Sequence, residues 1–343
     1  MREKARRTAY YEGTPREIGR EAGRRLGKRL ERNIEYYLRN RPIRPETPDP
    51  ARLYAEAIPL LRTLPARFQE ELEGLAEGSG LPLQKVAEWC AIERLVKDGC
   101  SGFISIIDGH AWLGRNNDSR APAVWGNASV KSVKNRIPTI SFGMEGDAFT
   151  TTGINKERLW LHYQYLPAAD KPRKDKRHLP AHALLTEALE TCTGIKEVER
   201  LLAATEREGG MILFAVDGKT DEVAIFECNC RKYKRRNPIE GRLMVTNHTS
   251  HTRHSSISES SASRLQRLTE TVGNKGWAGA TIPDDLIAVL ADDRIEQRDK
   301  QHFITVESAV ACPAQKKIWF TFGGYPAASC GNWRPLEWPW QEG

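Results

Sequence analysis

The chain has 343 residues, 39% hydrophobic and 28% charged, which fits a globular protein of one large domain or two ordinary ones and argues against extensive disorder. No apolar run approaches the roughly 18 residues of a membrane span, and no signal-peptide pattern follows the basic N-terminus, so we expect a cytoplasmic protein without a membrane partner. The net charge of +7 suits several kinds of anionic partner and selects none, while seven cysteines, an odd number, exclude a fully paired disulfide framework.

The chain before Cys100 is predicted to be entirely helical. Thr14 and Glu17, with a proline between them, form a capping box at a helix start. Apolar residues then recur every four positions from Ile18 to Ile34, as on one face of a helix. Prolines between 42 and 50 break this helix. Further helical patterns follow at 51–62, 66–77 and 83–97.

After Cys100 the pattern changes to strands. Strand patterns occupy 102–107, 111–115, 128–133, 138–143, 147–152 and 158–165, followed by helical patterns at 180–191 and 194–205. Strand patterns resume at 211–216, 222–228, 231–236 and 242–246, helical patterns at 260–272 and 282–291, and closing strands at 303–311 and 316–321. This alternation of blocks predicts an α+β fold in which two antiparallel sheets lie between helices.

The first two strands after the helical region form a predicted β-hairpin. The apolar run Phe103–Ile107 leads into an Asp-Gly turn, which is a strong hairpin signal, and the next run leads to Arg115 and Asp118. Antiparallel pairing would return Arg115 and Asp118 toward Cys100. A thiol, a guanidinium and a carboxylate would then converge at one end of a sheet.

Such a convergence can support nucleophilic chemistry at Cys100. A neighbouring cation raises the thiolate fraction of a thiol, and a carboxylate can orient a proton-accepting nitrogen. No histidine is obviously placed to act as the base, but cleavage before Cys100 would create an α-amino group, whose pKa is about 8. The alternative is a buried cysteine before a strand, with an arginine–aspartate pair on a loop.

A zinc site is a competing interpretation. His248, His251 and His254 recur every three residues, and Cys228 and Cys230 lie nearby in the sequence. Histidine and cysteine are the usual zinc ligands, but Cys-x-Cys is not the common spacing, and the histidines lie in a Thr/Ser-rich stretch. We therefore expect a loop that flanks the active site, and no metal.

A nucleic-acid site is suggested by the basic run from Arg231 to Arg236, which contains one tyrosine. Because this run follows the strand pattern at 222–228, a hairpin strand with its long basic side chains facing water fits better. We expect no nucleic-acid partner.

A papain-like cysteine protease would pair Cys100 with a distant histidine such as His248 or His302. The cysteine surroundings typical of that class are absent. The pair Gly99-Cys100 would also have no purpose in such an enzyme, so this interpretation ranks below the others.

Several short motifs, taken together, resemble the N-terminal-nucleophile hydrolases. The sequence is most similar to the acyl-coenzyme A:6-aminopenicillanic acid acyltransferase family, whose relatives include the choloylglycine hydrolases. The motifs that carry the resemblance are Gly99-Cys100, Gly114-Arg115-Asn116-Asn117-Asp118, Gly153-Ile154-Asn155-Lys156, Val245-Thr246-Asn247-His248 and Ser261-Ala262-Ser263-Arg264-Leu265, and they follow in the expected order over nearly the whole chain.

The resemblance implies an αββα four-layer sandwich and a precursor that cuts itself between Gly99 and Cys100. Residues 1–99 would then form a helical prosegment, or small subunit, that remains a partner of the catalytic domain at 100–343. The resemblance also implies a hydrolase or acyltransferase that acts on small linear amides or thioesters through an acyl-Cys100 intermediate. No cofactor is implied, although coenzyme A could carry the acyl group.

The same resemblance assigns roles to individual side chains. Cys100 would be the nucleophile, and its freed amino group the base. Asp118 would fix that amino group, and Asn247 would donate to the oxyanion. Arg115 and Arg264 would favour the thiolate and order the carboxylates. It assigns no second oxyanion donor, because 163–165 reads Tyr-Gln-Tyr where some relatives have an asparagine.

A second class of function remains open from the sequence. An uncut, non-catalytic protein of the same fold could bind acyl groups or anions and keep its basic N-terminal helix as a binding face. The sequence selects neither the acyl group nor the amine, and it leaves hydrolysis, transfer and oligomeric state open.

Overall fold

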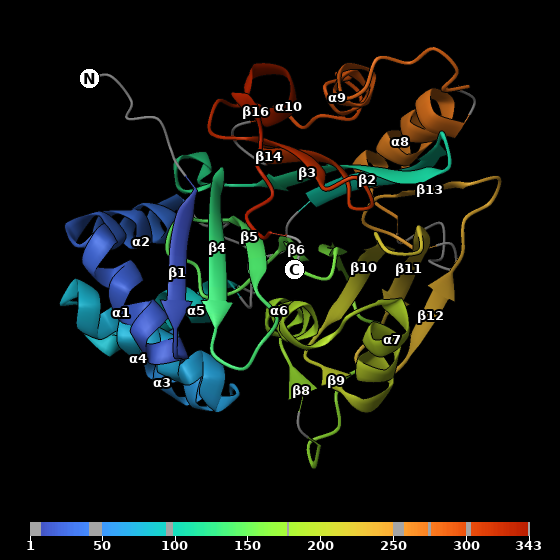
Figure 1. Cartoon of the computed structure of the whole chain (residues 1–343). Helices are drawn as coiled ribbons and strands as arrows, with labels where there is room; N and C mark the ends of the chain where they lie inside the picture. The colour runs from blue at the N-terminus through green and yellow to red at the C-terminus, as the bar shows by residue number, and fades with distance from the viewer. Residues whose placement is uncertain are drawn as a thin grey trace.

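The computed structural model describes residues 8–40, 50–93, 99–176, 178–249, 257–273, 276–299 and 303–341. Within these ranges the strands form an eight-stranded sheet, called sheet A, a six-stranded sheet, called sheet B, and a two-stranded ribbon (Figure 1). Neighbouring strands of both sheets are antiparallel, except for the β1–β4 pair at one edge of sheet A.

Neighbours in each sheet are often distant in sequence. In spatial order, sheet A consists of β1 (Ala9–Gly13), β4 (Asn127–Val133), β5 (Thr139–Gly143), β6 (Thr152–Asn155), β7 (Leu159–Leu166), β10 (Gly210–Asp217), β11 (Glu222–Cys228) and β12 (Tyr233–Arg236). Sheet B consists of β13 (Arg242–Val245), β2 (Gly99–Ile107), β3 (His110–Ser119), β14 (Ile304–Cys312), β15 (Lys317–Thr321) and β16 (Trp333–Pro335). The ribbon pairs β8 (His178–Leu179) with β9 (Glu206–Arg207).

The helices fall into three groups along the chain. The N-terminal group consists of α1 (Pro15–Leu26), α2 (Lys28–Asn40), α3 (Pro50–Arg62), α4 (Ala66–Ser79) and α5 (Leu83–Glu93). The other groups are α6 (Ala181–Thr191) with α7 (Ile195–Ala204), and α8 (Glu259–Leu268), its extension η3 (Thr269–Gly273), α9 (Asp284–Leu290) and α10 (Ala327–Cys330).

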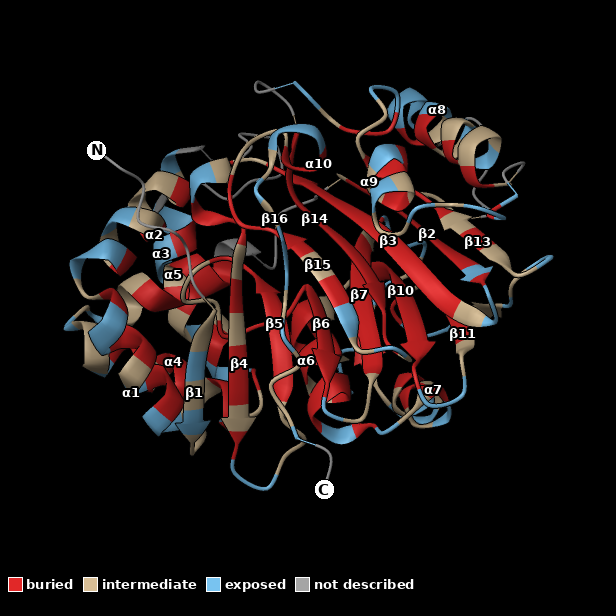
Figure 2. Cartoon of the chain, turned by 45° about the horizontal axis from the view of Figure 1, so that its top comes forward, coloured by how far each residue is buried: buried red, intermediate tan, exposed pale blue. Residues whose placement is uncertain are grey.

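The two sheets pack face to face, with helices on both outer faces. Ile104 and Leu113 of sheet B meet Phe142, Trp160 and Phe214 of sheet A in a core between the sheets. A second apolar cluster joins α6 and α7 to the outer face of sheet A, and a third joins α8 and α9 to the outer face of sheet B. Figure 2 shows that the strands are mostly buried, whereas most helices expose one side; α6 is buried almost throughout. The predicted αββα sandwich is therefore confirmed.

The prediction that everything before Cys100 is helical is wrong at one point. Ala9–Gly13 forms β1, which adds to the edge of sheet A by parallel pairing with β4, from Ala9 opposite Ser129 to Gly13 opposite Val133. The capping box at Thr14 and Glu17 is confirmed. The predicted single apolar helix is divided at Gly27, whose φ of 50° is in the left-handed region that favours glycine.

Other differences concern element boundaries. The strand predicted at 147–152 is wrong, because the chain bends through 144–151 and β6 begins only at Thr152. Small elements that carry no long sequence pattern, namely β8, β9, β16 and α10, were not predicted. Of the predicted helix at 83–97, residues 94–98 lie outside the described residues.

A buried group of charged side chains joins the N-terminal helices to the rest of the protein. Arg67 of α4 forms ion pairs with Glu71 of the same helix and with Glu190 of α6. Lys131 of β4 donates to Glu71 over 2.7 Å. Burial opposes ionisation of the Glu71 carboxyl, but Lys131 and Arg67 hold its pKa below the ordinary value. Residues before and after position 100 therefore share one buried ionic group as well as an apolar core.

Among the described residues, none of the helices combines the length and the apolar character that crossing a bilayer requires.

Candidate active site

The β2–β3 hairpin brings the predicted site residues together. Its turn is made by Asp108 and Gly109, both with positive φ, as the sequence predicted. The register pairs Gly99 with Asp118, and the next residue of β2, Cys100, with Asn117. The thiol of Cys100 and the guanidinium of Arg115 therefore meet as expected. The Asp118 carboxylate instead bonds Arg264 and Thr305, and the Cys100 nitrogen that it was expected to fix bonds Asn247.

The Cys100 side chain is completely buried on the face of β2 that also carries Ile104 of the inter-sheet core. Its thiol donates to Asn117 Oδ1 at an S···O distance of 3.5 Å. Arg115 Nη2 lies 3.7 Å from the sulfur and can donate to it. The sulfur is thus held by one amide oxygen and one guanidinium, both from β3.

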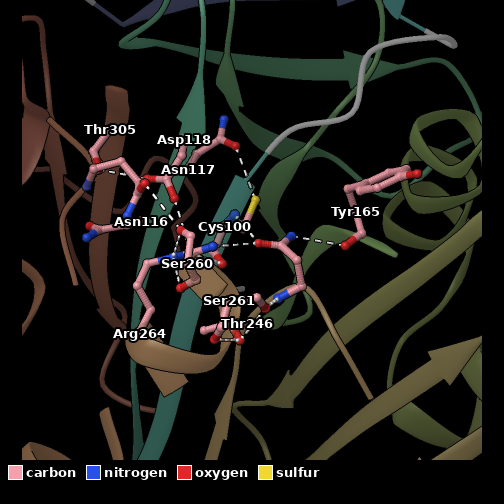
Figure 3. Close-up of polar contacts among 12 residues, drawn as sticks. Cys100, Asn116, Asn117, Asp118, Tyr165, Thr246, Ser260, Ser261, Arg264 and Thr305 are labelled. Atoms are coloured by element: carbon pink, nitrogen blue, oxygen red, sulfur yellow. Dashed lines mark hydrogen bonds and ion pairs between the residues drawn. The ribbon is translucent and has the colours of Figure 1, made fainter. Parts of the chain in front are cut away.

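The backbone nitrogen of Cys100 has its own partner on a different element. It donates to Asn247 Oδ1 over 2.9 Å, and Asn247 lies two residues after the end of β13. Figure 3 shows Cys100 among its neighbours Asn117, Tyr165 and Arg264. Asn247 Nδ2 donates to the backbone carbonyl of Tyr165 over 3.0 Å. These two bonds fix which end of the amide faces Cys100: an acceptor points at the Cys100 nitrogen, and the donor expected for an oxyanion is bonded to Tyr165.

Arg264 of α8 links the carbonyl group of Cys100 to Asp118. Its Nη1 donates to the Cys100 carbonyl over 2.5 Å and to Asp118 Oδ2 over 3.3 Å, while Nη2 donates to Asn247 Oδ1 over 3.0 Å. Asp118 also accepts from the Thr305 hydroxyl over 2.7 Å. Complete burial raises the pKa of the Asp118 carboxyl, and the Arg264 charge and the Thr305 hydrogen bond oppose that rise.

Gly99 lies against the same carboxylate. A Cβ atom added at Gly99 would lie 3.3 Å from Asp118 Oδ2, which is tighter than an ordinary contact. Glycine at this position therefore lets the backbone approach Asp118.

Arg115 is buried and is held by backbone and hydroxyl oxygens. Nη1 donates to the Thr151 carbonyl over 2.8 Å and to the Thr152 hydroxyl, and Nη2 donates to the Tyr163 carbonyl over 2.9 Å. These bonds connect sheet B to β6 and β7 of sheet A. The prediction places Arg115 close to Cys100, and the structure agrees.

Two residues of the site were not predicted from the sequence to have a role. Asn117 occupies the variable position of the Gly-Arg-Asn-x-Asp motif, and Glu307 lies opposite it on β14. Asn117 Nδ2 donates to Glu307 Oε1 over 3.3 Å. A charged residue in the middle of the apolar run at 303–311 was the available signal for Glu307.

Gln164 of β7 is a third site residue that was not predicted to have a role, and it connects sheet A to sheet B near Cys100. Oriented so that both ends of its amide are satisfied, it donates to the Thr246 carbonyl over 2.9 Å and accepts from Gly102 N over 3.3 Å. Beside it, His162 accepts from the Trp160 indole over 3.0 Å at Nδ1 and stacks on Phe214. The sequence could not separate these roles from ordinary strand packing.

Two buried histidines near Arg115 remain neutral over a wide pH range. Burial, with a smaller effect of Arg115, lowers the pKa of His162 far below its ordinary value and that of His182 to about 4. Neither is therefore a cation in the folded protein at neutral pH.

The low pKa of His182 predicts a pH-dependent stability. Between about pH 6.5 and 4 the unfolded chain binds a proton at His182 that the folded protein does not, so stability falls as the pH falls through that window, by up to roughly 3 kcal/mol for this group. The free energy of unfolding, measured in urea at several pH values across this range, should change less steeply with pH for His182→Leu than for wild type. An equal dependence of stability on pH in the two proteins would contradict the prediction.

The zinc interpretation concerns residues that the structure describes only in part. Among the residues that the structure describes, no three His, Cys, Asp or Glu side chains form a group that could hold a metal ion. His251, His254 and His302 lie outside the described residues. His248 instead bonds the Ser261 hydroxyl over 2.8 Å.

The basic run at 231–236 is organised as predicted, as a strand that pairs with β11. Arg235 forms ion pairs with Glu199 and Glu222, and Arg236 pairs with Glu227. These guanidinium groups are therefore already paired within the protein.

A cavity beside the N-terminal helices is not lined by Cys100. Its volume is about 600 Å³, and it lies between α1, α4 and the outer faces of β1, β4 and β5, with Tyr11, Arg25 and Lys131 among its lining residues. Cys100 points instead into the space between the sheets. The cavity is therefore not assigned to chemistry at the thiol.

Comparison with known proteins identifies a family match. Residues 107–326 match the model of the family described as acyl-coenzyme A:6-aminopenicillanic acid acyl-transferase. The matched range contains Arg115, Asp118, Asn247 and Arg264 but begins after Cys100. No curated protein sequence matches the chain at a significant level.

Several solved structures are similar to this chain. Penicillin V acylase from Agrobacterium tumefaciens has a TM-score of 0.49 and 14% identity, with 69% of this chain and 86% of that chain covered. A mutant of the conjugated bile acid hydrolase from Clostridium perfringens has a TM-score of 0.47 and 10% identity, with 70% and 97% covered. The Caenorhabditis elegans ortholog of N-acylethanolamine-hydrolyzing acid amidase has a TM-score of 0.47 and 15% identity, with 63% and 93% covered.

Proposed function

Because this chain belongs to the acyl-coenzyme A:6-aminopenicillanic acid acyl-transferase family, we propose that it is a self-processing cysteine hydrolase or acyltransferase for small linear amides or thioesters. One observation carries the proposal. The sulfur and the backbone nitrogen of Cys100 are held by separate partners, Asn117 with Arg115 and Asn247 respectively. A residue that must use both its thiol and its own nitrogen needs such an arrangement.

The first proposed step is self-cleavage. Cys100 Sγ attacks the Gly99 carbonyl carbon, the Gly99–Cys100 C–N bond breaks as the nitrogen takes the thiol proton, and a thioester forms. Water then hydrolyses the thioester, which gives a carboxylate at Gly99 and a free thiol and amine at Cys100. Residues 1–99 become the small subunit and 100–343 the catalytic domain.

Catalysis then uses the new amino group of Cys100 as the base. An N–H of the amine can keep its bond to Asn247 Oδ1 while the nitrogen lone pair accepts the thiol proton. Sγ attacks the substrate carbonyl, and the ammonium returns the proton to the leaving amine. Water or an acceptor amine releases the acyl group from Cys100, which determines hydrolysis or transfer.

The neighbouring charges order this centre. Arg264 binds the Cys100 carbonyl and pairs with Asp118, so it fixes the backbone at the new chain end. Arg115 places a positive charge beside the sulfur. For Asn247 to stabilise an oxyanion, its Nδ2 would have to exchange the Tyr165 carbonyl for the substrate oxygen.

The two fragments are expected to stay together after cleavage. Residues 1–99 contribute β1 to sheet A, apolar helix faces to a shared core and Arg67 to a buried ion pair with Glu190. Separation would expose this core and leave buried charges unpaired. Denaturing gels should show two pieces and native size-exclusion chromatography one particle; separate elution of the 1–99 fragment would contradict the expectation.

A substrate panel tests the proposed reaction. N-acyl amino acids, penicillins and acyl-coenzyme A esters are incubated with wild type and with Cys100→Ala, and free acid or amine is measured. Turnover of at least one compound by wild type alone supports the proposal. Turnover of casein with none of the panel would instead indicate a protease.

The second candidate is a non-catalytic protein that binds acyl groups or anions and remains uncut. The observation that favours it is the exposed Arg25, which lines the cavity between α1 and β4 and could bind an anion there. Intact mass spectrometry separates the candidates, since only the enzyme is expected to be cut.

A further inference from the structure

The charge of Arg115 has no carboxylate in direct contact. Within the described part of the chain, its hydrogen-bond partners are the oxygens of Thr151, Thr152, Tyr163 and Asn117, and the Cys100 sulfur. Burying a charge is costly unless an opposite charge lies near. The Arg115 charge acts on Asp118, lowering the pKa of that carboxyl, but Asp118 is already paired with Arg264.

Glu307 is connected to Arg115 through two bridging side chains, those of Asn117 and Thr152. Its Oε1 accepts from Asn117 Nδ2 over 3.3 Å and from the Thr152 hydroxyl over 3.4 Å. Asn117 Oδ1 and the Thr152 hydroxyl in turn both accept from Arg115. Glu307 is itself buried on β14, so its charge is little screened by water.

We propose that Glu307 is the counter-ion of Arg115 and keeps Cys100 largely in the thiol form. This inference rests on the proposed function only in treating Cys100 as a nucleophile. The effect of Glu307 on the Cys100 proton is expected whether or not the chain is an enzyme. Glu307 acts through Asn117 and Arg115, and is a positioning residue that does not touch the reacting atoms.

Two physical effects support the inference. The Glu307 carboxylate requires a donor from Asn117, which turns Asn117 Oδ1 toward the sulfur, and an oxygen acceptor there favours S–H over a thiolate. The carboxylate and a thiolate would also compete for the single positive charge of Arg115. Both effects hold the proton on Cys100 until a base takes it.

The other groups around the sulfur do not replace this effect. Arg264 and Asp118, from α8 and β3, form an ion pair at the Cys100 backbone. His162 on β7 and His182 on α6 are neutral at neutral pH because burial lowers the pKa of each. Glu307 on β14 adds a negative charge to these groups, and it bonds two side chains that accept from Arg115.

The test is a spectroscopic titration of Cys100. The ultraviolet absorbance of the thiolate is followed against pH as the difference between each protein and the same protein carrying Cys100→Ala, which needs no access for a reagent. The proteins are wild type, Glu307→Gln, Glu307→Asp and the control Glu227→Gln, which changes a buried carboxylate paired with Arg236. Intact mass records the cleavage state of every sample.

Glu307→Gln should move the titration midpoint down by about one pH unit, which is about a tenfold larger thiolate fraction below the midpoint. Glu307→Asp keeps the charge and should stay close to wild type, as should Glu227→Gln. Thr152→Val removes one bridge without deleting a charge, and should move the midpoint in the same direction by less, which tests the inference even if Glu307→Gln does not fold.

Equal shifts in Glu307→Asp and Glu307→Gln would mean that packing and not charge matters, and would overturn the inference. An unchanged or higher midpoint in Glu307→Gln and Thr152→Val would do the same. Amidase activity is read separately: an inactive protein with the expected shift contradicts only the proposed function, and an active protein without it contradicts only the role of Glu307.

Discussion

Replacing Cys100 with alanine is expected to abolish amide cleavage, with a loss of about ten-thousand-fold or more in kcat. The proposed acyl-enzyme forms on Cys100 Sγ, and its base is the nitrogen of the same residue. Within the described residues no other thiol shares this site, because Asn117, Arg115 and Asn247 converge on Cys100 alone. The measurement is single-turnover acid release from the best compound of the substrate panel.

The control is Cys330→Ala, which removes the exposed cysteine of α10 and should leave turnover unchanged. Cys100→Ser should cut itself and turn over slowly, because a hydroxyl is the weaker nucleophile at neutral pH. Turnover by folded Cys100→Ala at more than a small fraction of the wild-type rate would exclude Cys100 as the nucleophile.

Replacing Asn247 should give the second large effect and should separate its two possible roles. Asn247→Asp keeps an oxygen for the Cys100 nitrogen but loses the N–H that now bonds Tyr165. If that N–H moves to the oxyanion during the reaction, kcat should fall by about 100- to 1000-fold. Asn247→Leu loses both groups and should also slow self-cleavage, since the Cys100 nitrogen loses its acceptor.

The measurements are kcat of the cut protein and the rate of appearance of the cut. Self-cleavage at the wild-type rate in Asn247→Leu would contradict a positioning role for the Asn247 oxygen. An unchanged kcat in Asn247→Asp would contradict the oxyanion role, and would leave the second donor to be sought among other groups near Tyr165.

Much of the fold could be predicted because local patterns were strong. The capping box at Thr14, the Asp-Gly turn at 108–109 and the strand and helix blocks after 158 all carry period or turn signals that survive in the structure. By contrast, β1 is five residues long, and it pairs in parallel with a strand more than a hundred residues away, so nothing local marks it as part of a sheet.

The site residues also differ in whether the sequence could place them. Arg115 and Asp118 could be placed near Cys100 because a hairpin register follows from its turn. Glu307 and Gln164 reach the same place only through the pairing of β14 with β3 and the stacking of the two sheets. The orientation of the Asn247 amide depends on two backbone partners from different strands, which no sequence motif records.

Intact mass and N-terminal sequencing of the purified wild-type chain, beside Cys100→Ala, test the central claim most directly. The account predicts two fragments for wild type, with the larger beginning Cys-Ser-Gly-Phe, and one chain of 38.7 kDa for Cys100→Ala. A wild-type chain that remains at 38.7 kDa and still cleaves amides at full rate would contradict the mechanism in which the Cys100 amine is the base.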